Sequence, residues 1–209
     1  MTSANIKSAI YARADEIIPA STSYDPFESY MTTILDECYR QILNECPLHL
    51  LPFTEYTTPT IVMDTTNSIA YVKKPTGFIR LGHFYFTDWT NPARKFITPE
   101  HPDYKMIENG VKVGGKVKPV VVMLDAMLGS DTKPEKYLAC YQVTSSTSAK
   151  LYYVKYDATP ATGIELIDDT VITNGLAWLG AAKLLKIANE KAWELAEQAY
   201  MTFIATNTK

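Results

Sequence analysis

The sequence is poor in the residues that build cross-linked or reactive sites. Its 209 residues include three histidines and three cysteines, and Cys38, Cys46 and Cys140 are too few and too odd in number for a disulfide scaffold. Cys38 and Cys46 fall on one expected helix, about 12 Å of rise apart, which is beyond bridging distance. We therefore expect three reduced thiols, in keeping with synthesis in the cytoplasm.

Long apolar runs and a strong charge of one sign are also missing. The longest apolar run, Val120–Leu124, is far shorter than the roughly 18 residues that suggest a membrane span. The N-terminus carries Arg13, Asp15 and Glu16 where a signal peptide needs an apolar core. With 46% hydrophobic and 21% charged residues and a formal charge of -3, the chain is neither disordered nor a polycation that coats nucleic acid. Composition predicts a soluble globular protein that does not enter a membrane.

The N-terminal quarter has the periodicity of helices. Asp25-Pro26-Phe27-Glu28 is a capping box with proline at the first helical position. Apolar residues follow at three- and four-residue steps as far as Pro47: Phe27, Tyr30, Met31, Ile34, Leu35, Cys38, Tyr39, Ile42 and Leu43. A shorter helix is expected over Ile6–Ile17, and a polar turn at Ala20–Tyr24 separates it from the longer helix. We expect the apolar stripe of the longer helix to face the core.

Between residues 52 and 168 the pattern changes to short strands. Thr60–Asp64 and Ile69–Lys73 are expected to form a hairpin. Phe78–Thr87 alternates, which predicts Ile79, Leu81, His83 and Tyr85 on one face and Arg80, Gly82, Phe84 and Phe86 on the other. The remaining expected elements are strands at Val117–Leu124, Tyr137–Val143 and Leu151–Tyr156, and a short helix over Pro99–Asn109.

Helical periodicity returns at Asp168-Asp169, where two acidic residues complement the helix dipole. The two apolar stripes are Val171, Leu176, Leu179, Ala182 and Leu185 (or Leu184), then Trp193, Ala196, Tyr200 and Phe203. A break at Asn189 would make a helical hairpin, and its absence one long kinked helix. The order of elements predicts an α+β protein: one domain over 1–209, with helices in 1–50, an antiparallel β-rich insertion in 52–168 and a helical hairpin in 169–205.

Motifs for catalysis are weak. Gly110–Lys116 has the glycine and lysine spacing of a phosphate-binding loop, but Val117 replaces the hydroxyl residue and a β-branched run follows in place of a helix. The histidines have no metal-ligand spacing, and Cys140 lies in an apolar strand pattern typical of a core. We assign no catalytic, cofactor-binding or metal-binding residue and expect a protein that is not an enzyme. An enzyme whose site is assembled from distant positions remains an alternative.

Charge and aromatic residues are unevenly distributed. Residues 1–50 have three basic and seven acidic side chains, whereas residues 70–118 have nine basic and four acidic ones. The second segment is either an ordinary solvated face or a basic strip for phosphate or an acidic partner. Tyr152-Tyr153 and Phe84-Tyr85-Phe86 place aromatic rings on both faces of a strand, which fits a sheet buried on both sides or a partner surface.

Four segments of the central region carry a family resemblance. They are Lys74–Leu81 (KPTGFIRL), Thr87–Arg94 (TDWTNPAR), Pro102–Lys105 (PDYK) and Lys118–Val120 (KPV). Together they resemble the sheet region of head-to-tail connector (ring or adaptor) proteins of crAss-like tailed bacteriophages. The pattern from Asp169 to Phe203 is similar to the last helical hairpin of adaptors in other tailed phages.

The resemblance implies a virion structural protein that forms a homo-oligomeric ring, commonly a dodecamer, in the phage neck. Such a ring joins the portal protein to other neck and tail ring proteins and lines the channel through which genomic DNA leaves. It implies assembly in the host cytoplasm and residence at the head-tail junction of the virion. We expect Tyr200, Phe203 and Lys209 to contact the portal or a neighbour. The alternative function is a nucleic-acid-binding accessory protein that uses the basic 70–118 region.

Overall fold

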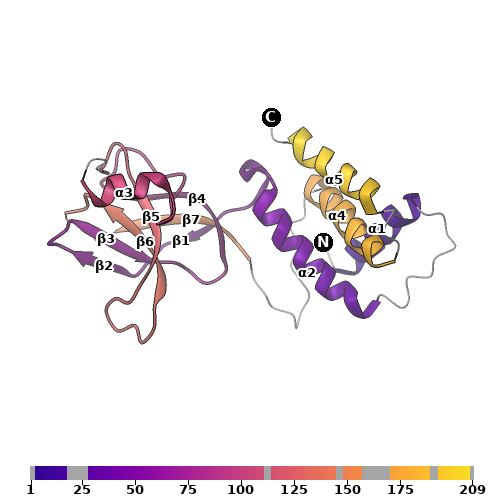
Figure 1. Ribbon diagram of the computed structural model, residues 1–209, viewed down its shortest axis with the longest axis horizontal. Coiled ribbons are helices and arrows are strands. Elements are labelled where there is room, and N and C mark those ends of the chain that lie inside the picture. The colour runs from indigo at the N-terminus through magenta and orange to yellow at the C-terminus, as the bar shows by residue number, and fades with distance from the viewer. Residues whose placement is uncertain are drawn as a thin grey trace. The chain divides into compact units, whose positions relative to one another are not determined.

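The chain divides into two compact units, described here by a computed structural model of residues 3–17, 28–110, 114–144, 148–156, 170–188 and 193–207. Met1–Pro52 and Tyr156–Lys209 form a helical unit, and Phe53–Lys155 form a β unit (Figure 1). The β unit is therefore an insertion between two helical segments. The α+β fold class predicted from the sequence is confirmed. The single connector domain stays a prediction.

Four α-helices make up the described part of the helical unit. They are α1 (Ser3–Ile17), α2 (Glu28–Glu45), α4 (Thr170–Ala188) and α5 (Trp193–Asn207), with a short 3-10 helix, η2 (Leu48–Leu50), after α2. Helix α4 packs against all three others, which explains why so many of its positions are alanine, glycine or leucine. None of the described helices is long and apolar enough to cross a membrane.

The predicted apolar stripe of α2 is confirmed over most of its length. Its buried residues are Met31, Ile34, Leu35, Cys38, Tyr39, Ile42, Leu43 and Cys46. The prediction was wrong at Tyr30, which is 57% exposed because it lies at the edge of the stripe. The prediction for α4 was likewise wrong at one position: Val171 is exposed, and the neighbouring Ile172 is buried in its place. The capping box before Glu28, the turn at 20–24, Asp168-Asp169 and the break at Asn189 lie outside the described residues.

Two glycines let the helices of this unit approach closely. A Cβ on Gly175 would lie 2.6 Å from Cζ of Phe203, and one on Gly180 would lie 2.7 Å from Cγ1 of Ile10. Both distances are far below van der Waals contact. The lack of a side chain at Gly175 therefore leaves room for the ring of Phe203 in α5, and the lack of one at Gly180 leaves room for Ile10 in α1.

Two antiparallel sheets form the β unit. The first has the order β1-β7-β4, from Thr54–Tyr56, Ala149–Lys155 and Phe78–Phe86. The second has the order β2-β3-β6-β5, from Ile61–Asp64, Ile69–Lys73, Glu135–Tyr141 and Val121–Ala126. Strands β2 and β3 form the predicted hairpin, with Ile61 opposite Val72.

One core lies between the two sheets. It takes Val72, Leu138 and Cys140 from the second sheet and Phe84 and Leu151 from the first. Helix α3 (Pro102–Glu108) packs on the other face of the second sheet through Ile107, which contacts Val122 and Ala139 there. The predicted short helix within 99–109 is therefore confirmed.

The strict alternation predicted for residues 78–87 was wrong at Leu81. Register shifts between Phe78 and Arg80 and between Leu81 and His83 interrupt the pairing of β4 with β7. Each extra residue flips the side chains that follow, so Leu81 is buried together with Phe84. The fifth strand also begins later than predicted, at Val121, because its preceding residues are tied into a loop.

Candidate functional site

The three cysteine thiols lie in the protein interior and not at an exposed reactive site. All are free and buried. Burial raises the pKa of Cys38 to about 12 and raises the pKa of Cys140 further, so both stay protonated at neutral pH and are poor nucleophiles. Within the described ranges no three His, Cys, Asp or Glu side chains gather closely enough to hold a metal ion.

The glycine- and lysine-containing loop has the reverse order of a phosphate-binding loop. It follows α3 and leads into β5, whereas a phosphate-binding loop leaves a strand and starts a helix. The side chain of Lys116 is engaged with Asp88, at 2.7 Å between Nζ and Oδ2. Residues 111–113 lie outside the described part of the chain. The strand expected after this loop is confirmed.

Segments that carry the family resemblance come together beside this loop. The backbone N–H groups of Thr90 and Asn91 donate to the carbonyl oxygen of Lys116 at 2.9 and 3.3 Å. The Asn91 side chain donates to the carbonyl of Val117 at 2.8 Å. Further on, Ile97 bridges to β5. The TDWTNPAR segment therefore lies beside the two residues that precede the KPV segment, and the residues after it lie beside β5.

A cleft of about 320 Å³ opens where these segments meet α3. Ten residues line it: Lys95, Phe96, Ile97, His101, Asp103, Ile107, Lys118, Pro119, Val120 and Val121. We call it the basic cleft. Most of its lining is apolar, and the basic side chains are exposed. It therefore offers a hydrophobic floor with cations beside it.

Two lysines give the basic cleft its charge. Within the described part of the chain, neither Lys95 nor Lys118 has an ion-pair partner. His101 caps α3: its Nδ1 accepts from the backbone N–H of Asp103 at 3.1 Å. A ring that accepts at Nδ1 carries its proton on Nε2, which is then free to donate. The Asp103 carboxylate lies 4.0 Å from the same Nδ1 and contributes the one negative charge of the lining.

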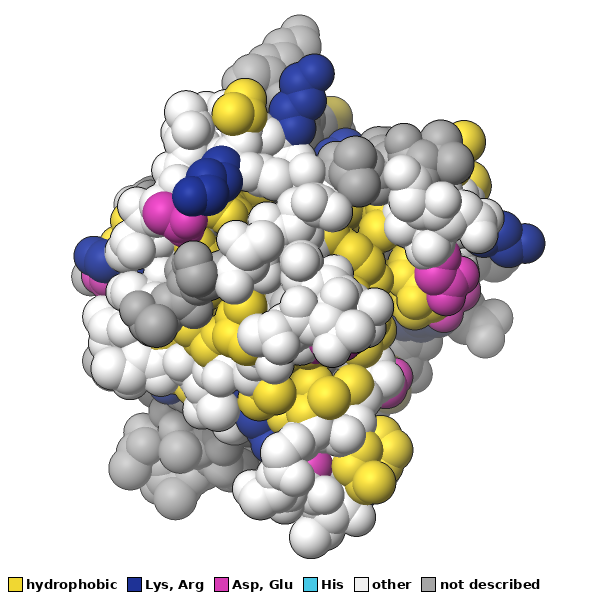
Figure 2. All heavy atoms as spheres, turned by 90° about the vertical axis from the view of Figure 1, so that its left-hand side faces the viewer, with side chains coloured by type: hydrophobic (Ala, Val, Ile, Leu, Met, Phe, Trp, Pro, Cys, Tyr) yellow, Lys and Arg dark blue, Asp and Glu magenta, His cyan; other side chains and the backbone are white. Residues whose placement is uncertain are grey.

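Four half-buried or exposed aromatic side chains lie together on the first sheet. We call Phe53, His83, Tyr85 and Tyr152 the aromatic platform. The rings of His83 and Tyr152 stack with centroids 4.3 Å apart, and Tyr85 stacks on His83 at 6.1 Å. Burial, and then the charge of Arg94, lower the pKa of His83, which keeps its ring neutral at pH 7. Figure 2 views the molecule from the side of the β unit and shows apolar side chains reaching the surface in several patches.

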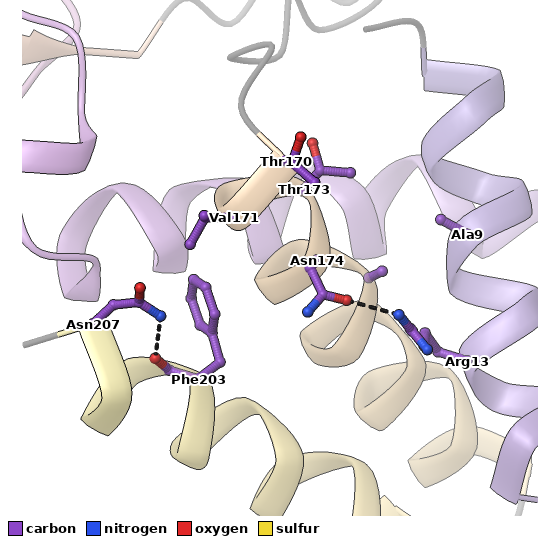
Figure 3. A pocket seen from close by; sticks show the side chains of 9 residues that line it. Ala9, Arg13, Thr170, Val171, Thr173, Asn174, Phe203 and Asn207 are labelled. Atoms are coloured by element: carbon purple, nitrogen blue, oxygen red, sulfur yellow. Dashed lines mark hydrogen bonds between the residues drawn. The ribbon is translucent and has the colours of Figure 1, made fainter.

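The helical unit has a groove of about 530 Å³ between α1, α4 and the end of α5 (Figure 3). Arg13 lies in it but is fully engaged: it donates to Asn174 at 2.9 Å and to Glu16 at 2.5 Å, and its guanidinium lies 4.9 Å from the Trp178 ring centroid. On the other wall, the Asn207 side chain donates to the backbone carbonyl of Phe203. Of these contacts, those of Arg13 with Asn174 and Trp178 join α1 to α4, whereas the other two each lie within one helix.

The expected contact residues of α5 occupy interior positions. Tyr200 is 1% exposed, and its hydroxyl donates to the Glu45 carboxylate at 2.6 Å. Burial, followed by this hydrogen bond, raises the pKa of Tyr200. Phe203 packs against Gly175. Both side chains fix α5 to the rest of the helical unit; contact with a neighbouring protein stays a prediction, and Lys209 lies outside the described residues.

The outer face of α5 is both acidic and apolar. Leu195 and Met201 are each 58% exposed. Glu194 and Glu197 are exposed beside them, and neither has an ion-pair partner in the described ranges. We call these four residues the acidic ridge. Sequence reasoning found neither the ridge nor the cleft, although the high basic content of residues 70–118 indicated the region where the cleft lies.

No protein-family model and no curated protein matches this chain.

Proposed function

We propose that this chain is a structural protein of the phage neck, which forms a homo-oligomeric ring between the portal and the tail. The observation that carries the proposal is the division of charge between the two units. The helical unit has 7 Lys and Arg against 14 Asp and Glu, a net charge of -7, and the β unit has 13 against 9, a net charge of +4.

A ring of identical subunits needs two different faces that complement each other, because each subunit contacts its neighbours head to tail. An acidic unit and a basic unit in the same chain supply such a pair. Like units repel and unlike units attract, so the charges disfavour an isologous dimer of either unit with itself. The small total charge of -3 also suits a channel through which DNA must slide without binding.

Assembly state tests the proposal. Light scattering with size-exclusion chromatography, native mass spectrometry and negative-stain microscopy of the purified chain should give one discrete species of many copies with a central hole. The species should dissociate as salt rises from about 0.05 to 1 M, over which the Debye length falls from roughly 14 to 3 Å. It should also bind the portal protein of the same phage. A chain that is monomeric at all salt concentrations and does not bind portal would overturn the proposal.

A nucleic-acid-binding accessory protein is the second candidate, favoured by the aromatic platform. Stacked rings such as His83 and Tyr152 can receive unpaired bases, and each stacked base contributes about 1–3 kcal/mol. This function predicts affinity for single-stranded DNA that falls steeply with salt and is weakened by Tyr152→Ala. Ring assembly without such affinity would exclude it.

A further inference from the structure

We propose that the basic cleft of one copy of this chain receives the acidic ridge of the next copy, and that this is the contact that closes the ring. The inference rests on the proposed ring function and adds which surfaces meet. The occupant of the cleft is therefore helix α5 of a second copy.

The cleft has the composition of a site for a side chain that is apolar with acids beside it. Its lining includes the apolar Ile97, Ile107 and Pro119. Its cations are Lys95 and Lys118, against the single acid Asp103. A volume of about 320 Å³ is at the small end for binding sites, which suits a few protruding side chains better than a large ligand. Hydrogen bonds at Thr90, Asn91 and Ile97 hold the walls of the cleft in place, so binding costs little conformational entropy there.

The acidic ridge has the complementary composition. Met201 follows Glu197 by four residues and Glu194 by seven, so the three share one helix face; Leu195 lies about 100° around the helix from Glu194, on the side away from Glu197. Leu195 and Met201 are exposed by 58% each, which leaves two large apolar side chains in water near two glutamates that have no ion-pair partner among the described residues. Burying Met201 in an apolar cleft is favourable, and each glutamate can then pair with a lysine at the edge of the cleft.

Two other exposed apolar residues of the helical unit do not offer this chemistry. Tyr30 and Ile187 border a hollow of about 340 Å³ between α2 and α4. Its acid, Glu37, already pairs with Lys183 at 3.0 Å, and Lys186 lies over the Trp193 ring. The lining of that hollow carries a net charge of +1, from Lys183 and Lys186 against Glu37, so it has no electrostatic attraction to the basic cleft.

Charge reversal tests the contact. The cleft variant is Lys95→Glu with Lys118→Glu, and the ridge variant is Glu194→Lys with Glu197→Lys. Each alone places like charges across every contact, and we expect the concentration needed for half-assembly to rise about 10- to 100-fold. The matched control is Lys105→Glu with Lys133→Glu, which changes the same charge at two exposed lysines outside the cleft and should assemble normally.

Mixing the two variants distinguishes a contact between copies from one within a chain. In an alternating ring the acidic cleft of one variant meets the basic ridge of the other, and the next contact joins a wild-type cleft to a wild-type ridge. Equimolar mixtures should therefore assemble at near wild-type concentration. Rescue only when all four substitutions are in one chain, with none on mixing, would overturn the proposal.

Crosslinking gives a readout that does not depend on reversing charge. The native cysteines are buried, so Lys118→Cys with Glu197→Cys adds the only exposed thiols of the described residues. A short bismaleimide should then produce a ladder of linked copies, which neither single variant gives beyond a dimer. If the wild type forms rings, the charge variants assemble equally well and no ladder appears, this contact is refuted and the ring function is not. A wild type that never forms rings sinks both, and salt-sensitive DNA affinity lost in the cleft variant would assign the cleft to nucleic acid.

Discussion

Replacing Leu35 by aspartate should unfold the helical unit and leave the β unit folded. Leu35 is 3% exposed on the inner face of α2. Losing its packing costs about 2–5 kcal/mol, and burying a polar group without a partner adds about 1–3 kcal/mol. The sum, about 3–8 kcal/mol, is comparable with the whole stability of a domain, about 5–15 kcal/mol. The matched control is Tyr30→Asp, at a 57% exposed position of the same helix.

The three cysteines report on each unit separately. Cys38 and Cys46 are buried in the helical unit and Cys140 in the β unit. A pKa of about 12 in place of 9.0 leaves Cys38 with roughly a thousandfold less thiolate at pH 8, before access is considered. Thiol labelling followed by mass spectrometry of peptides should therefore show Cys38 and Cys46 accelerated at least about 100-fold in Leu35→Asp. Unchanged labelling would place Leu35 at the surface, and equal acceleration of Cys140 would show that the units unfold together.

Three further substitutions test the packing and the electrostatics. Tyr200→Phe removes the hydrogen bond to Glu45 and should cost about 1–2 kcal/mol at pH 7. Because the pKa of Tyr200 is raised by folding, its contribution is lost above about pH 10, where an unfolded tyrosine ionises, so melting temperatures of variant and wild type should converge at pH 11. Gly175→Ala should lower the melting temperature by overpacking against Phe203, and adding Phe203→Leu should restore part of the loss. Hydrogen bonds from Tyr137 and then from a lysine hold the pKa of Asp131 below 3.8, so Asp131→Asn should flatten the fall in β-unit stability as the pH drops below that value; an acid melt as steep as the wild type's would count against it.

Periodicity predicted the elements because local burial and secondary structure coincide in most of them. The stripe of α2 has three- and four-residue steps, and strand β3 buries every second residue, so each pattern can be buried in only one arrangement. It failed at Leu81 because a bulge adds a residue to one strand, which no alternation can reveal. Helix α4 was predicted with one apolar stripe, but it packs on three helices and is buried on most sides.

The candidate contact surfaces could not be predicted in the same way, because they depend on which charges find partners in space. Lys73 and Lys116 belong to the same basic strip as Lys95 and Lys118. The first two are paired, with Asp131 and Asp88, and the last two have no ion-pair partner among the residues that the structure describes. A count of charges along the sequence treats all four alike. The fold separates them, because it brings Asp131 to Lys73 and Asp88 to Lys116 from other parts of the chain.

Removing residues 204–209 should separate attachment to the portal from closure of the ring. Residues 204–207 are the last turn of α5, and the truncation removes the Asn207 side chain that donates to the Phe203 carbonyl. We expect a cost of about 1 kcal/mol, a small fall in melting temperature, because Tyr200 and Phe203 still anchor the helix. The acidic ridge ends at Met201, so rings should form at the wild-type concentration.

Binding of these truncated rings to the portal should nevertheless weaken, since the end of α5 and Lys209 are the expected portal contact. A second truncation that removes only residues 208–209 tests Lys209 with the described part of α5 intact. If both truncated chains join portal complexes as well as the full-length chain in sedimentation, the C-terminus has no role in docking. If the longer truncation abolishes the ring itself, α5 closes the ring through its tip and not through the acidic ridge. The two results therefore refute different contacts, one to the portal and one between copies of this chain.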